Sequence, residues 1–150
     1  MTLPIDPAAI DPDEYGEQQT TLAMDHDEAI EYVREVCLDN GFGVPVEFSP
    51  SEMLNAKVDA DRDPYYVLGA CNPEMANRAL NATERRIGAL FPCNMIIWEE
   101  TPGQQRVYHL SIMKIARLLG LPAAADEIDE IIADTGEMVE AVFAELDADD

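Results

Sequence analysis

Residues 66–73 are Tyr-Val-Leu-Gly-Ala-Cys-Asn-Pro, and they predict a buried strand that runs directly into a helix. Asn72 is a preferred helix N-cap, and Pro73 suits the first helical position because its missing amide hydrogen has no helical partner there. Cys71 therefore lies just outside a helix N-terminus, where the partial positive charge of free amides favours a thiolate. Glu74 and burial of the sulfur oppose that effect, so we expect only modest activation of Cys71.

On both sides of this junction the chain alternates between strand and helix patterns. Alternating or continuous apolar residues predict strands at 20–24, 44–48, 65–71, 87–99 and 106–110. Capping residues followed by apolar residues three and four apart predict helices after Asp25 or Asp27, from Ser51, from Pro73, after Ser111 and along the stripe from Ile128 to Leu146. This order, with one hairpin turn at 101–103, indicates α+β, a single domain with a mixed, mostly antiparallel sheet flanked by helices. We expect residues 1–16 to form a loose acidic N-terminal arm and residues 17–150 to form the domain.

The charge of the chain is strongly negative, since 31 Asp and Glu face 9 Lys and Arg and the formal net charge is −22. Self-repulsion of this size weakens a compact state in ordinary buffer, whereas ~1 M salt shortens the Debye length to about 3 Å and screens it. The composition predicts a protein of a salt-accumulating, haloarchaeal-type organism. The alternative is an acidic mesophilic protein that binds cations or basic partners. Under either interpretation, the sequence has no basic patch that would bind nucleic acid or an anionic membrane.

The expected location is cytoplasmic. No apolar run approaches the ~20 residues that cross a bilayer, and the first residues lack the basic start and apolar stretch of a signal peptide. Three cysteines are an odd number and too few for a disulfide framework, which favours a reducing compartment.

Two segments carry a family resemblance. Gly69-Ala70-Cys71-Asn72-Pro73, and Leu90-Phe91-Pro92-Cys93-Asn94 followed by a strand, resemble the family catalogued as domain of unknown function 302, over about residues 20–145. The resemblance implies a small α+β domain of the TATA-binding-protein-like class. The family has no agreed activity, so the resemblance carries over no catalytic role, and the fold label implies no DNA binding.

Cys71 and Cys93 have similar surroundings, each followed by Asn and close to a proline. If the strand at 87 lies parallel to the strand at 65–71, six residues of about 3.3 Å each carry both chains to the same level of the sheet. The candidate binding or thiol site is then Cys71, Asn72, Pro73, Cys93 and Asn94. Three interpretations remain open: two small core residues, a redox pair, or a metal-binding pair. Cys37 falls on an apolar helix face and is expected in the core.

Apart from the cysteine pair, the sequence marks no metal site, and it identifies no cofactor. His26 and His109 lack ligand spacing to another His or Cys, so we expect each to be a structural or a surface histidine. The acidic run 59–63 resembles the start of a calcium loop, but Pro64 occupies the position that requires glycine.

Two function classes follow. The first is a non-enzymatic small-ligand-binding or self-association module adapted to high salt. The alternative is a thiol-dependent redox or metal-handling protein that uses Cys71 and Cys93. A homodimer is also expected, because Met95 and Ile97 point to one side of their strand while Ile96 and Trp98 point to the other, so both sheet faces are apolar.

Overall fold

The computed structural model describes residues 6–121 and 125–148. Its strands are β1 (Gln18–Leu22), β2 (Gly43–Phe48), β3 (Tyr65–Cys71), β4 (Cys93–Thr101) and β5 (Gln104–His109). Its α-helices are α1 (His26–Asp39), α2 (Pro50–Val58), α3 (Pro73–Ala82), α4 (Ile112–Leu119) and α5 (Ala125–Ala148). Short 3-10 turns are η1 (Pro7–Ala9), η2 (Pro12–Tyr15) and η3 (Arg86–Leu90).

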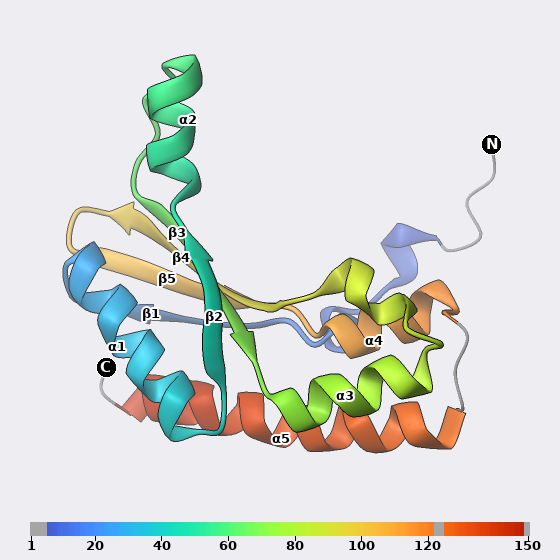
Figure 1. Cartoon of the computed structure of the whole chain (residues 1–150). Helices are drawn as coiled ribbons and strands as arrows, with labels where there is room; N and C mark the ends of the chain where they lie inside the picture. Colours follow the sequence, from blue (N-terminus) through green and yellow to red (C-terminus); the bar gives the residue numbers. More distant parts are fainter. Residues whose placement is uncertain (1–5, 122–124, 149–150) are drawn as a thin grey trace.

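The strands form one antiparallel sheet in the order β1-β5-β4-β3-β2. Helices α1 and α5 pack on one face of this sheet, which we call the inner face. Helices α3 and α4 lie beyond one end of the sheet, and α2 projects from the opposite end (Figure 1). The predicted α+β single-domain class is therefore confirmed.

One predicted strand pairing was wrong. The strand at 65–71 does not run parallel to a strand that starts at residue 87, because β3 and β4 are antiparallel and Ala70 lies opposite Cys93. Residues 86–90 form η3, and β4 begins only after Pro92. The sequence predicts a strand over 87–99 that Pro92 interrupts, and only the part after Pro92 is a strand, because proline has no amide hydrogen for the ladder.

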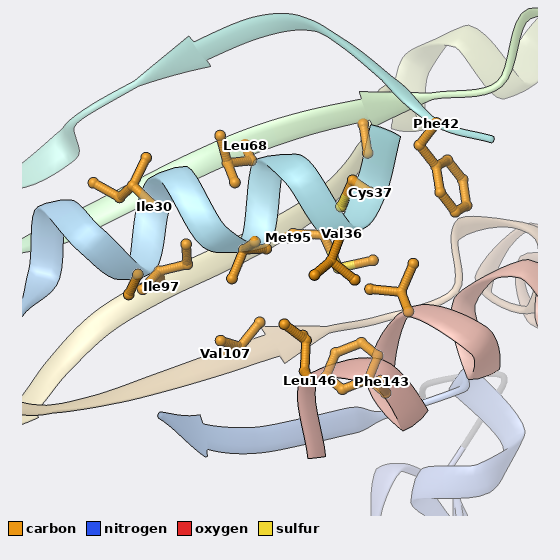
Figure 2. Close-up of a cluster of buried hydrophobic side chains, with 14 of the residues drawn as sticks. Ile30, Val36, Cys37, Phe42, Leu68, Met95, Ile97, Val107, Phe143 and Leu146 are labelled. Atoms are coloured by element: carbon orange, nitrogen blue, oxygen red, sulfur yellow. The ribbon is translucent and has the colours of Figure 1, made fainter. Parts of the chain in front are cut away.

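The sheet core fills the space between the inner face, α1 and the C-terminal half of α5 (Figure 2). Alternate residues of the central strands, such as Leu68, Met95 and Ile97, are fully buried there because successive side chains of a strand point to opposite faces. Cys37 is buried among them, which confirms its predicted place in the core.

A second cluster, the helical core, lies beyond the end of the sheet. It joins η3, α3 and α4 to the N-terminal half of α5, and its buried residues are Ala79, Ala82, Ile87, Met113, Ala116, Ile128 and Ile131. The apolar stripe predicted from Ile128 to Leu146 is present, and α5 uses its first half in the helical core and its second half in the sheet core.

Residues 6–16 of the predicted N-terminal arm form η1 and η2. The backbone of η2 is tied to α4, since Ser111 N donates to Tyr15 O at 2.9 Å and Lys114 Nζ donates to Asp13 O at 2.9 Å. Residues 1–5 of the arm lie outside the described residues. Over 6–121 and 125–148, the structure contains no helix with the length and apolar character of a membrane span.

Candidate functional site

An apolar cavity of about 270 Å³ lies where the two cores meet. The end of β3, the start of β4 and helices α3, α4 and α5 all contribute to its wall. Its lining residues are Phe42, Pro45, Val46, Ala70, Cys71, Asn72, Met75, Ala76, Ala79, Phe91, Pro92, Cys93, Ile112, Met113, Ile131 and Thr135.

Asn72 fixes the junction of β3 with α3 as the sequence predicts. Its Oδ1 accepts a hydrogen bond from Met75 N at 2.9 Å, which is N-cap geometry. Its Nδ2 donates to Gly41 O at 2.9 Å and so ties the end of α1 to the start of α3. Both polar atoms of the Asn72 side chain are therefore engaged by the protein itself.

Helices α3 and α5 supply facing walls. Ala76 and Ala79 place small side chains at the cavity, which leaves the space that a larger residue would fill. On α5, Thr135 Oγ1 donates to Ile131 O at 2.7 Å, so its hydrogen is committed to its own helix. The hydroxyl consequently adds little polar character to the wall.

Cys71 and Cys93 lie on the same cavity wall. Antiparallel pairing brings the last residues of β3 beside the first residues of β4, with Ala70 opposite Cys93. Burial, and to a lesser extent the nearby Cys71, raise the pKa of the Cys93 thiol to about 11. At neutral pH the Cys93 thiol is therefore protonated.

Pro73 and Asn94, the other two candidate residues, do not line the cavity. Pro73 is the exposed first residue of α3. Asn94 is exposed on β4, and its carbonyl oxygen lies 3.0 Å from His109 Nδ1. Pro73 and Asn94 therefore shape the backbone next to the cavity and do not form its wall.

His109 lies in the wall of a second, smaller cavity of about 90 Å³ that also touches Cys93. Burial lowers the pKa of His109, so its ring is neutral at pH 7. A carbonyl oxygen can only accept, so Nδ1 carries the proton that is donated to Asn94 O. His26 Nδ1 lies 2.8 Å from Gln105 Oε1, so both histidines are held by structural hydrogen bonds.

Sequence reasoning missed most of the cavity wall. Met75, Ala76 and Ala79 repeat at helical spacing after Asn72, and this pattern could have marked the cavity side of α3. Ile131, Thr135 and the α4 residues carry no such signal, because only the fold brings them to Cys71. The structure shows no group of three or more His, Cys, Asp or Glu able to hold a metal ion within residues 6–121 and 125–148.

The comparison with protein families identifies the chain. The family model described as "Domain of unknown function DUF302" matches residues 18–146. The chain belongs to this family. The match contains every strand of the described residues and all of the cavity wall, so the cavity lies within the part of this chain that matches the family.

A solved DUF302 protein has a similar fold. The "Crystal structure of uncharacterized conserved protein DUF302 from Bacillus stearothermophilus" is 25% identical to this chain, with a TM-score of 0.72. The similarity covers 84% of this chain and 94% of the other. A search of curated proteins found no match to this DUF302 chain.

Proposed function

We propose that this DUF302 domain is a non-enzymatic module that binds a small, uncharged, mainly apolar molecule in the cavity between its two cores. The cavity itself is the observation that carries the proposal. A volume of about 270 Å³ is near the lower end of small-molecule pockets. The cavity opens to solvent, so an apolar guest would remove its apolar wall from water and gain dispersion contacts with it.

The chemistry of the wall selects the class of ligand. Among the described residues that line the cavity, none carries a formal charge at neutral pH. The side chains of Asn72 and Thr135 already bind the backbone, so a charged guest would lose its hydration without compensation. The same wall offers no carboxylate or imidazole for acid–base catalysis, which supports a binding role.

The proposed setting is a cytoplasm of high salt. The net charge of −22 supports adaptation to high salt, because screening removes repulsion that the fold otherwise contains. Cys37, Cys71 and Cys93 are all unpaired, which supports a reducing compartment.

Indole is a suitable uncharged, aromatic probe of the cavity. In multimolar KCl, indole should shift the methyl NMR signals of Met75 and Met113, which line the cavity, and leave Met53 on α2 unchanged. The Ala76→Phe variant should lose these shifts and keep or raise its melting temperature, because the new ring occupies the empty volume. Methyl-labelled methionine spectra and thermal melts measure both effects.

Ala133→Phe is the matched control, since Ala133 is exposed on α5 away from the cavity wall. It should bind indole as the unchanged protein does. Indole shifts that survive in Ala76→Phe, or that never occur in the unchanged protein, would contradict the proposed function.

The shared wall of Cys71 and Cys93 favours a second candidate function, a thiol-dependent redox or metal-handling role. The electrostatic effect of Cys71 on Cys93 supports it, because a pair of interacting thiols can be oxidised together or hold a soft metal ion. The raised pKa of Cys93 works against it, because the thiolate is the reactive form.

Alkylation of the folded protein separates the two candidates. Burial raises the pKa of Cys93 from 9.0 to about 11 and that of Cys37 from 9.0 to about 12. Cys93 should therefore have about a hundredfold less thiolate than an ordinary cysteine at pH 8, and its reaction with iodoacetamide should accelerate with pH up to about 11. Mass spectrometry of peptides measures each site. Rapid modification of Cys93 at pH 7 would favour the thiol-dependent function.

Cys71→Ser and Cys37→Ser are a matched pair for both candidates. Replacement of Cys71 should alter indole binding or redox behaviour, whereas replacement of the buried Cys37 should alter only stability.

A further inference from the structure

The outer face of the sheet, opposite α1 and α5, carries a row of aromatic side chains. Tyr65 stacks on Trp98 with ring centroids 6.0 Å apart, and Trp98 meets Tyr108 at 6.0 Å. These three residues come from adjacent strands, and they line an open depression of about 480 Å³. Phe48 of β2 pairs with Val67, two residues from Tyr65, so it points to the same face and is 47% exposed.

Helix α2 stands at one end of this face and projects away from the two cores (Figure 1). Its first turn is anchored to β3, since Ser49 and Ser51 hydroxyls donate to Tyr65 O. Beyond that turn, Met53 is 43% exposed and Val58 is 66% exposed. A helix of nine residues is marginal in water without tertiary contacts, so this one benefits from a surface that covers its apolar side chains.

The charges of the molecule are divided between its two sides. Helices α1 and α5 carry 14 acidic residues and one base, Arg34. The five strands and α2 together carry four acidic residues and two bases, which are Glu47, Glu52, Glu99, Glu100, Lys57 and Arg106. The turn at 59–64 between α2 and β3 adds three acidic residues and one base, and of these Asp63 and Arg62 line the depression. Arg106 and Glu100 neutralise each other, with Nη2 and Oε2 2.8 Å apart.

This division of charge indicates which kind of partner the outer face can bind. A basic partner would be attracted to the helical side, where the acidic residues are concentrated. A second copy of the chain, itself at −22, meets less repulsion at the outer face, which is apolar and less acidic than the helical side. We propose that the outer face, with α2 at its edge, is the interface of a two-fold homodimer. In such an interface the same patch serves both copies, so Phe48, Val58 and Trp98 of each copy become buried by the other.

Light scattering in multimolar KCl at tens of micromolar protein should give about twice the chain mass of 16.6 kDa. Phe48→Glu and Val58→Glu each place a carboxylate on both sides of the two-fold axis and should each give the monomer mass. Trp98 is the single tryptophan, so its emission should move to longer wavelength in these variants and on dilution of the unchanged protein.

Leu38→Glu is the matched control, because Leu38 is 54% exposed on α1, on the helical side. It should remain a dimer. Circular dichroism establishes that each variant is folded. If one of the two variants does not fold, the other still tests the interface. A monomeric unchanged protein would overturn the proposal. A dimer that persists in both folded variants would also overturn it.

Discussion

Dilution of KCl from multimolar concentration to below a few tenths molar is expected to unfold or loosen this protein. The helices α1 and α5 pack together and carry more than half of the excess negative charge, and from Leu118 to Asp150 the chain has 11 acidic residues and no base. Dilution lengthens the Debye length, so carboxylates that are screened in high salt begin to repel one another. Melting temperatures across a series of KCl concentrations measure the effect, and a melting temperature independent of KCl would contradict it.

Arg78 of α3 is the residue that most directly opposes this repulsion. Its guanidinium lies 2.7 Å from Asp134, 3.5 Å from Glu127 and 3.9 Å from Glu130, three carboxylates that follow one another at three- and four-residue spacing along α5. Arg78→Gln should lower the melting temperature by the largest amount near the lowest salt at which the protein folds. The loss should shrink as KCl increases.

Arg86→Gln is the control for Arg78→Gln. Arg86 pairs only with the nearby Glu84 in the part of the chain that the structure describes, and both side chains are exposed. Its replacement should change the melting temperature little at any salt concentration. Equal effects of the two substitutions, or a loss for Arg78→Gln that does not depend on salt, would show that packing of Arg78 matters more than its charge.

The Gly69→Ala substitution, which adds one methyl group, is expected to destabilise the fold by about 1–3 kcal/mol. A Cβ at this position would lie 2.7 Å from Pro92 Cγ and 2.8 Å from Val46 O. The second contact is with the backbone of the neighbouring strand β2, so a side-chain rotation cannot relieve it. Because Pro92 and Val46 both line the cavity, Gly69→Ala should also weaken indole binding.

Gly136→Ala is the control, and its expected effect on stability has the opposite sign. Gly136 lies inside α5, and a Cβ there meets no atom within 4 Å, so alanine should raise stability by about 0.5–1 kcal/mol through its higher helix propensity. Urea unfolding in constant high KCl measures both changes as shifts of the midpoint. Effects of the same sign for the two glycines would contradict this explanation.

The sequence by itself determined the local elements, because their signals lie within a few residues of each other. Asn72 and Pro73 place the start of α3, and Ser111 and Gly120 bound α4 through an N-cap hydrogen bond and a left-handed C-cap. The strand at 65–71 has its predicted bounds. The prediction failed where local pattern was ambiguous, at 87–92, since an apolar run before a proline fits a strand or a 3-10 turn equally well.

Only the tertiary structure decided which elements meet. The direction of β4 relative to β3 depends on the path of the chain through α3 and η3, and no capping or alternation signal encodes it. The cavity likewise needs Ala76, Met113 and Thr135, which are far apart in sequence and carry no chemistry that identifies them. Arg78 meets Glu127 and Asp134 across separations of 49 and 56 residues. Local residues therefore fix what each segment becomes, whereas burial of apolar surface and contacts between opposite charges, such as that of Arg78 with Asp134, fix where the segments lie.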